Sequence, residues 1–272
     1  MSLALEKKLV LPSGIELSYS EHGDRRGPAL ILLHGYTDSR RSFDPLTPHL
    51  PDWMRAIAIS LRGHGDSTKA RSRYDCREHA ADMAQALDAL AIDGAVIAGH
   101  SMSSMIAQRL ALDLGDRVQG LILLGAFRTL GGNPAVEALR EEIAKLGDPV
   151  DPGFVRAFQE STVCKPVPAS FMSTVIEESL KVPAFVWRAA LSAQLGDSFA
   201  DELPRVRARA MVIWGDQDSI TPYEEQLELT SALAHTELHV LRGVGHALHW
   251  EEPETVARLI ARFVRRTQSA AA

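Results

Sequence analysis

The stretch Ala95-Val96-Ile97-Ala98-Gly99-His100-Ser101-Met102-Ser103-Ser104-Met105 joins two sequence patterns around one serine. Its first half is a short apolar run with β-branched residues, which is typical of a strand buried on both faces. After Ser101, apolar side chains recur at three- and four-residue spacing through Leu110, which indicates a helix. The stretch therefore predicts a strand, a tight turn that carries Ser101, and a helix.

Small residues stand two positions to either side of this serine. The arrangement matches the nucleophile elbow, G-x-S-x-G, in which a tight turn lifts the serine hydroxyl clear of the sheet. The helix that follows points its amide N–H groups at whatever the serine attacks. The fifth position is Ser103 instead of glycine, which we interpret as a tolerated variant because serine is also small. From these five residues alone, an ordinary strand-to-helix turn remains the alternative.

Around this stretch the chain alternates strand and helix patterns. Such alternation indicates an open, mostly parallel sheet with helices on both faces, and ligands bind such sheets beyond the carboxyl ends of the strands. A hairpin comes first, and its second strand alternates apolar and polar residues, as an antiparallel edge strand does. The expected strands are 9–11, 15–20, 29–33, 55–59, 95–98, 119–127, 210–214 and 237–241, with helices near 42–50, 77–90, 102–110, 221–234 and 253–265.

The alternation stops between residues 128 and 206. Instead, four amphipathic helices are expected, each beginning at or near a proline, which suits a first helical turn. We predict a core domain formed by residues 1–127 and 207–272, with 128–206 inserted as a helical cap over the strand ends; a layer that only packs is the alternative. The expected cap helices are 134–146, 152–162, 168–180 and 183–195.

The composition limits the functional class. The 272 residues are 46% hydrophobic and 24% charged, as in ordinary globular proteins, and the net charge of −6 argues against a nucleic-acid partner. The first residues show no secretory pattern, and no apolar run is long enough to span a membrane. Cys76 and Cys164 lack metal-ligand spacing and suit free thiols in a reducing cytoplasm. We expect a cytoplasmic monomer or homodimer that binds a small-molecule substrate, with no metal and no membrane contact.

Three expected strand-end loops each offer one member of a catalytic set: Ser101, Asp218 and His246. A serine hydroxyl is a weak nucleophile and needs a base to take its proton. The base in turn needs a carboxylate that fixes its tautomer and supports its positive charge. The chain order Ser, Asp, His is the order of α/β hydrolases.

At this point the chain resembles the α/β-hydrolase superfamily over nearly its whole length. The resemblance implies an α/β-hydrolase fold with a mostly parallel eight-stranded sheet, an inserted helical cap and no cofactor. Its carriers are His34-Gly35-Tyr36, Arg62-Gly63-His64-Gly65-Asp66-Ser67, Gly99-His100-Ser101-Met102-Ser103, Trp214-Gly215-Asp216-Gln217-Asp218, and Gly245-His246 followed by Glu251-Glu252-Pro253.

The resemblance also separates competing residues. The family places its acid three residues after the glycine of W-G-x-x-D, which selects Asp218 and leaves Asp216 as a turn residue. Some members carry the acid after the sixth strand, but residues 124–127 contain no carboxylate. His249 is interpreted as a surface or packing residue and His100 as a structural or pocket-wall residue. By the resemblance, His34 supports the oxyanion loop and His64 is structural.

An oxyanion hole needs two backbone N–H donors. Met102, after the nucleophile, is expected to give one, and the resemblance assigns the other to Tyr36. The Tyr36 ring is expected either to line the pocket and offer its hydroxyl to substrate or to pack under the cap. Among the cap aromatics, Trp187 is the favoured substrate-binding residue.

These residues predict a serine hydrolase that cleaves a small-to-medium, partly apolar carboxylic ester or lactone through an acyl-enzyme on Ser101. Ser101 argues against family members with an aspartate nucleophile. Carbon–carbon bond hydrolases of meta-cleavage products are the main alternative, although they often carry an aromatic residue where Ala247 stands. Amide hydrolases of catabolic pathways, and a hydrolase-like small-molecule receptor, remain further alternatives.

Overall fold

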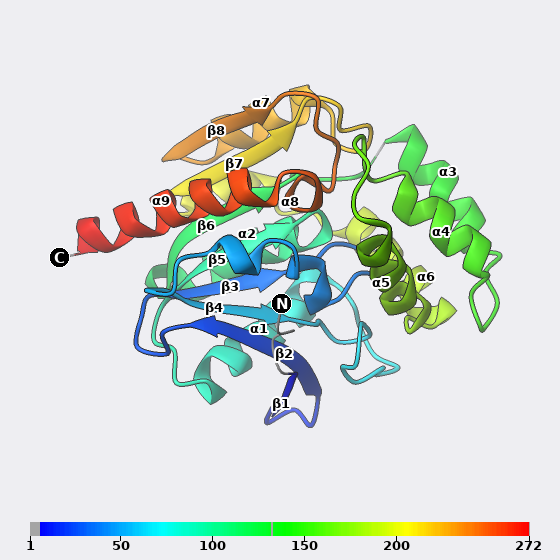
Figure 1. Cartoon of the computed structure of the whole chain (residues 1–272), viewed down its shortest axis with the longest axis horizontal. Helices are drawn as coiled ribbons and strands as arrows, with labels where there is room; N and C mark the ends of the chain where they lie inside the picture. The colour runs from blue at the N-terminus through cyan, green and yellow to red at the C-terminus, as the bar shows by residue number, and fades with distance from the viewer. Residues whose placement is uncertain (1–5, 132, 272) are drawn as a thin grey trace.

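The computed structural model describes residues 6–131 and 133–271, and these form an α/β-hydrolase fold around one eight-stranded sheet (Figure 1). The strand order is β1-β2-β4-β3-β5-β6-β7-β8. Strands β4, β3 and β5 to β8 run parallel, whereas β2 is antiparallel to both of its neighbours. The predicted fold class is therefore confirmed. The strands are β1 (Lys7–Val10), β2 (Glu16–Gly23), β3 (Ala29–Leu33), β4 (Arg55–Ile59), β5 (Ala95–His100), β6 (Val118–Leu124), β7 (Ala210–Gly215) and β8 (Thr236–Leu241).

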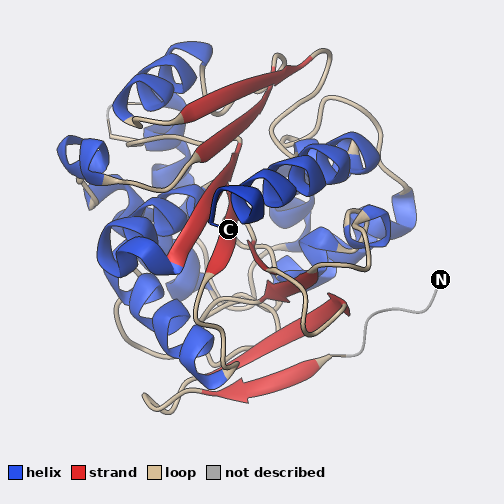
Figure 2. Ribbon diagram, turned by 90° about the vertical axis from the view of Figure 1, so that its left-hand side faces the viewer, coloured by secondary structure: helices blue, strands red, loops and turns tan. Residues whose placement is uncertain are grey.

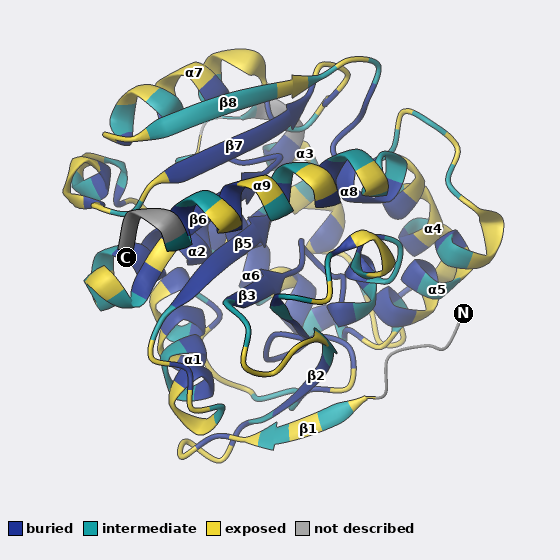
Figure 3. Ribbon diagram, turned by 60° about the vertical axis from the view of Figure 1, so that its left-hand side comes forward, coloured by how far each residue is buried: buried dark blue, intermediate teal, exposed yellow. Residues whose placement is uncertain are grey.

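The sheet buries both faces, as its continuous apolar strands predict (Figure 3). Because side chains alternate along a strand, Ile31 and Leu33 join one apolar cluster and Leu30 and Leu32 join the other. The first cluster packs against α1 (Cys76–Ala89), α2 (Met102–Leu114) and α7 (Tyr223–Ala232). The second packs against α9 (Pro253–Ala271). The helices thus enclose the twisted sheet from two sides (Figure 2).

Two local predictions are wrong. A helix over 42–50 was expected, but the chain forms only two 3₁₀ turns there, η1 (Arg40–Phe43) and η2 (Thr47–His49). Pro45 and Pro48 explain the difference, because proline lacks the N–H that an α-helix interior needs. An alternating edge strand was expected over 15–20. Instead, β1 pairs with the outer edge of β2, and residues 17–20 of β2 are all buried. The short elements η3 (Gly115–Arg117), η4 (Ala200–Arg205) and α8 (Leu248–Glu251) were not predicted.

Between β6 and β7 the chain forms four helices that lie together to one side of the sheet (Figure 1). They share the first apolar cluster with the sheet, and Val175 of α5 also packs with Ala247 and Trp250 in a small third cluster. Prolines begin α3 and α4 and cap the N-termini of α5 and α6. The division into a core domain and a cap at residues 128 and 206 stays a prediction. The helices are α3 (Pro134–Ile143), α4 (Pro152–Glu160), α5 (Ala169–Leu180) and α6 (Ala184–Gly196).

Among the described residues, no helix is both long enough and apolar enough to cross a membrane.

Candidate active site

Ser101 occupies a strained turn between β5 and α2. Its φ of 51° and ψ of −118° are a conformation that side-chain-bearing residues rarely adopt. The turn is held because the Ser101 N–H donates to the Leu124 carbonyl of β6 at 2.9 Å. A Cβ at Gly99 would lie 2.1 Å from the Ser103 carbonyl oxygen, so only glycine fits there. The tight turn that the sequence predicts is therefore present, and Ser101 lines a cavity above it.

Ser103 does more than fill a small space. Its side chain is fully buried, and its hydroxyl donates a short hydrogen bond to the His34 carbonyl oxygen. His34 lies directly after β3, at the start of the predicted oxyanion loop. The first turn of α2 is therefore tied to that loop by a bond that a glycine at position 103 would not make.

Asp218 and His246 form a buried hydrogen-bonded pair at the ends of β7 and β8. The His246 Nδ1 and the Asp218 Oδ2 are 2.8 Å apart. The other Asp218 oxygen accepts from the backbone N–H groups of Ile220 (2.8 Å) and Thr221 (2.9 Å). Burial acts to raise the pKa of Asp218, but its attraction to His246 and its hydrogen bonds with His246 and Thr221 outweigh it, and the pKa is lowered. The carboxylate is thus held ionised against one imidazole nitrogen.

The surroundings of this pair distinguish Asp218 from the two other positions considered for the acid, Asp216 and the end of β6. Asp216 is exposed, and its carboxylate accepts from the Gly243 N–H at 2.6 Å, which is the role of a turn residue. At the end of β6, Gly125 has a φ of 51°, and a Cβ there would lie 3.0 Å from the His246 Nδ1. This second position for an acid in the family therefore has no room for a side chain.

The histidines His100, His249 and His64 are buried in the core. His100 packs 4.9 Å from the His246 ring, and its Nε2 donates to the His246 carbonyl at 3.1 Å. Burial, aided by the neighbouring His246, lowers the pKa of His100 to about 3, which keeps it neutral. His249 is buried against His100, with its Nε2 2.9 Å from the Ser42 hydroxyl, so it is a packing residue and not a surface one. His64 is also buried, and its Nδ1 donates to the Arg62 carbonyl at 2.8 Å.

His34 fixes the loop after β3. The Leu61 N–H donates to the His34 Nε2 at 3.0 Å, so the hydrogen lies on Nδ1, which donates to the Gly35 carbonyl at 2.8 Å. Within the described chain, neither the Tyr36 N–H nor the Met102 N–H donates to another group. Both amides therefore remain available, and their joint role as an oxyanion hole stays a prediction.

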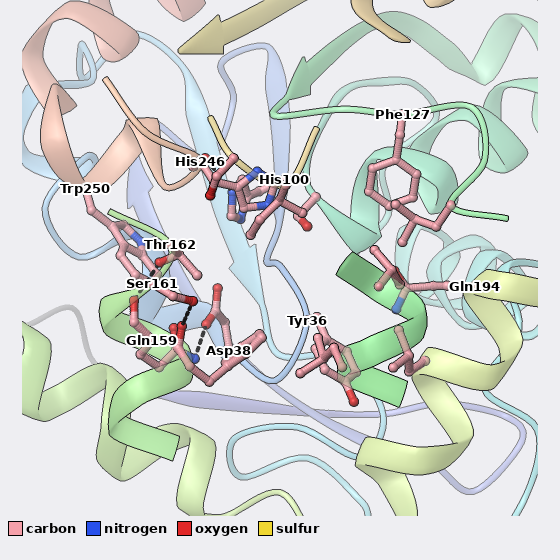
Figure 4. A pocket seen from close by; sticks show the side chains of 18 residues that line it. Tyr36, Asp38, His100, Phe127, Gln159, Ser161, Thr162, Gln194, His246 and Trp250 are labelled. Atoms are coloured by element: carbon pink, nitrogen blue, oxygen red, sulfur yellow. Dashed lines mark hydrogen bonds between the residues drawn. The ribbon is translucent and has the colours of Figure 1, made fainter. Parts of the chain in front are cut away.

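A cavity of about 260 Å³ lies between the strand ends and the inserted helices (Figure 4). Ser101 and His246 both line it. Asp38, Gln159, Ser161 and Thr162 lie on one side of the two histidines in Figure 4, and Phe127 and Gln194 lie on the other. Apolar side chains from the inserted helices also line the cavity: Val136, Leu139 and Leu191, with Leu130 before them in the chain.

The two predicted substrate-binding side chains have different outcomes. Tyr36 lines the cavity, but its hydroxyl donates to the Trp187 carbonyl at 2.5 Å and is not free for substrate. Trp187 is fully buried, packs 5.4 Å from the Tyr36 ring, and is not among the residues that line the cavity. The structure therefore does not favour the predicted contact of Trp187 with substrate, which stays a prediction.

Among the polar residues of the cavity that were not predicted, Asp38 and Gln159 are hydrogen-bonded to each other. Asp38 follows Tyr36 by two residues, so a carboxylate in a strand-end loop was the signal that could have found it. Gln159 lies on α4, and nothing in its sequence context sets it apart from a surface glutamine. The Gln159 Nε2 donates to Asp38 at 3.1 Å and to Ser179 at 2.7 Å. No cluster of three or more His, Cys, Asp or Glu in the described residues could hold a metal ion.

Comparisons with known proteins agree with this fold. The family model described as the alpha/beta hydrolase fold matches residues 28–253. A 2-hydroxy-6-oxononadienedioate/2-hydroxy-6-oxononatrienedioate hydrolase of Burkholderia vietnamiensis is 27% identical over 282 residues, 94% of each chain. A solved thermophilic esterase from Thermogutta terrifontis is 25% identical with a TM-score of 0.84, covering 97% of this chain and 99% of its own. An esterase from Exiguobacterium antarcticum has a TM-score of 0.86 at 23% identity, covers 96% of this chain and all of its own, and is similar in fold.

Proposed function

Since the chain belongs to the α/β-hydrolase family, we propose that it is a serine hydrolase of small-to-medium carboxylic esters or lactones. The observation that carries the proposal is the Asp218–His246 pair, bonded at 2.8 Å, whose histidine opens into the same cavity as Ser101. The three groups come from the ends of β5, β7 and β8, so the sheet fixes their positions.

In the proposed reaction, His246 takes the Ser101 proton as the hydroxyl oxygen attacks the substrate carbonyl. The Tyr36 and Met102 N–H groups stabilise the developing oxyanion, and each such donor typically contributes about 10²–10³ in kcat. His246 then protonates the leaving alcohol, and an acyl-enzyme remains on Ser101. A water molecule, deprotonated by His246, releases the acid and restores the serine. Asp218 keeps Nδ1 of His246 protonated throughout.

The cavity favours this reaction over hydrolysis of meta-cleavage products. The Burkholderia relative is named for a dioate, a dicarboxylate substrate, yet no lysine or arginine occurs among the described residues that line the cavity. Arg128 is engaged by Glu225 and Glu228, and Arg188 is exposed and bonded to the Leu146 carbonyl. A largely apolar cavity without a cation suits an uncharged acyl group better than a dicarboxylate.

The test is turnover of p-nitrophenyl esters of increasing acyl length by the wild type and by Ser101→Ala. We expect multiple turnovers by the wild type and none above background by Ser101→Ala, which should keep the wild-type melting temperature. Ser161→Ala is the matched control, because Ser161 also lines the cavity but bonds the Phe158 carbonyl. Mass spectrometry should find an acyl adduct on Ser101 in the wild type.

Three results would speak against the proposal. Unchanged hydrolysis by Ser101→Ala would exclude Ser101 as the nucleophile. A single slow turnover that leaves the protein permanently acylated would favour the small-molecule receptor. An activity confined to anilides or to vinylogous diketone acids would favour an amide hydrolase or a carbon–carbon bond hydrolase, respectively.

A further inference from the structure

The cavity above Ser101 contains a carboxyl group that the proposed hydrolysis does not use. Asp38 is only 4% exposed, yet it lines the cavity together with Ser101 and His246. Its Oδ1 accepts from the Gln159 Nε2 at 3.1 Å, and its Oδ2 lies 3.3 Å from the Ser42 hydroxyl. Both partners are uncharged, so these hydrogen bonds leave the charge of the carboxylate uncompensated.

The charged groups around Asp38 are engaged elsewhere. Arg41 and Glu178 border a small crevice beside Asp38, but Arg41 pairs with Asp44 and Glu178 with Lys181. On the cavity side, His246 attracts the Asp38 charge but is hydrogen-bonded to Asp218.

Burying an ionised carboxylate without a neighbouring cation costs free energy of folding. Burial raises the pKa of Asp38 to about 7, and the hydrogen bonds from Gln159 and Ser42 only partly oppose it. A group that enters the cavity and donates a hydrogen bond to this carboxylate would remove most of the cost, and a cationic donor would remove the most.

The position of Gln159 orients the carboxyl group. Its amide also donates to the Ser179 hydroxyl at 2.7 Å, and that hydroxyl donates to the Thr37 carbonyl at 3.0 Å. These hydrogen bonds join helices α4 and α5 to the loop that carries Asp38. Apolar side chains, among them Leu130, Val136 and Leu191, also line the cavity.

We propose that Asp38 is a specificity-determining residue that binds an ammonium group of the substrate, while the apolar side chains of the cavity lining hold the hydrocarbon part. The substrate class is thereby an amino-substituted ester or lactone. This inference rests on the proposed function for the ester bond, but recognition of the ammonium group is a separate property of the cavity.

The experiment compares esters that differ only in charge. One pair is 3-(dimethylamino)propyl acetate and its carbon isostere 4-methylpentyl acetate, with the charge in the alcohol. The other pair is methyl 4-(dimethylamino)butanoate and methyl 5-methylhexanoate, with the charge in the acyl group. In at least one pair we expect the wild type to have a higher kcat/KM for the amine than for its isostere. Asp38→Asn should reduce this ratio about 10-fold to 100-fold, because KM for the amine rises. The introduced asparagine retains an acceptor for Gln159, so the variant should fold.

Ser179→Ala is the control for a structural effect. It removes the hydroxyl that joins Gln159 to the Thr37 carbonyl, but it leaves the cavity charge intact. A role of Asp38 in holding the loop would make both variants slow the amine and its isostere equally. Recognition of the ammonium group predicts that only Asp38→Asn changes their ratio.

The pH dependence gives a second readout. The ratio of kcat/KM within a pair cancels the titration of His246, because both esters use the same triad. We expect the ratio to rise with pH around 7 in the wild type, as Asp38 ionises while the amine stays protonated, and to stay flat in Asp38→Asn.

Binding to Ser101→Ala, measured by calorimetry, separates the two proposals. Tighter binding of the amines than of their isosteres, lost in Ser101→Ala/Asp38→Asn, would support the inference even if no ester were turned over. Equal binding of both members of each pair, or a wild-type preference that Asp38→Asn leaves unchanged, would overturn it. Failure of the proposed function alone would appear as missing Ser101-dependent turnover with the binding preference intact.

Discussion

The hydrogen bond from Ser103 to the His34 carbonyl shows how one side chain joins two parts of the site. The acceptor is buried, and without its donor it would remain unsatisfied. We therefore expect Ser103→Ala to lower the free energy of unfolding by about 1–3 kcal/mol and to lower kcat, because the loop that begins at His34 carries the Tyr36 amide. Urea unfolding and p-nitrophenyl ester kinetics measure the two effects.

Ser231→Ala is the comparison, because Ser231 is also helical but exposed, with its hydroxyl bonded to the Leu227 carbonyl. Its effect should stay within about 0.5 kcal/mol. Equal, small effects of both substitutions would mean that Ser103 is only a permissible replacement for glycine in the elbow.

Asp38 should make stability depend on pH in an unusual direction. Its folded-state pKa of about 7 lies above its ordinary value, so between these two values the folded state binds a proton that the unfolded state has lost. Stability then falls as pH rises, by about 1.4 kcal/mol per pH unit for this group. From pH 5 to pH 7, the free energy of unfolding of Asp38→Asn should rise relative to that of the wild type. Above pH 7 this difference should change little. Urea unfolding across this range measures it, and a constant difference at all pH values would contradict the assignment.

At the scale of elements, the ends of the strands decide the site. Gly125 ends β6 with a positive φ, and the space for its Cβ is taken by the His246 ring. Gly125→Ala should therefore push this ring away from Asp218 and lower kcat at least about 10-fold. The positive φ should also destabilise the alanine variant by about 1–2 kcal/mol. Gly147→Ala is the matched control, because Gly147 has an ordinary φ and no atom within 4 Å of its Cβ position. If both variants keep wild-type kcat, the contact at Gly125 does not position His246.

The elements differ in how well the sequence predicts them. Buried parallel strands such as β3 and β5 are continuous apolar runs, so pattern alone finds them. Residues 42–50 form two 3₁₀ turns instead of the expected helix because Pro45 and Pro48 lack the N–H that an α-helix interior needs. Ser101, Asp218 and His246 were predicted because each follows a strand. Gln159 and the burial of Trp187 depend on how the inserted helices pack, and no local pattern records that packing.

At the scale of the whole molecule, fold and substrate choice are encoded separately. The Thermogutta esterase keeps a TM-score of 0.84 at 25% identity, because the fold requires only apolar periodicity and a few glycines. The Burkholderia relative covers 94% of this chain and is named for a dicarboxylate, whereas the described residues that line this cavity include no lysine or arginine. Substrate choice therefore depends on the few side chains that the inserted helices and the loop after β3 turn into the cavity.

The shared core makes a prediction about cooperativity. Trp187 in α6 belongs to the same apolar cluster as Ile31 in β3, so the inserted helices should not unfold separately from the sheet. We expect one calorimetric transition whose van't Hoff and calorimetric enthalpies agree. Trp187→Ala should destabilise the protein by about 3–5 kcal/mol and move the whole transition to lower temperature. Phe43→Ala, in the cluster on the opposite face of the sheet, should do the same. A separate low-temperature transition in Trp187→Ala alone would instead identify the inserted helices as an independent unit, able to open over Ser101 while the sheet stays folded.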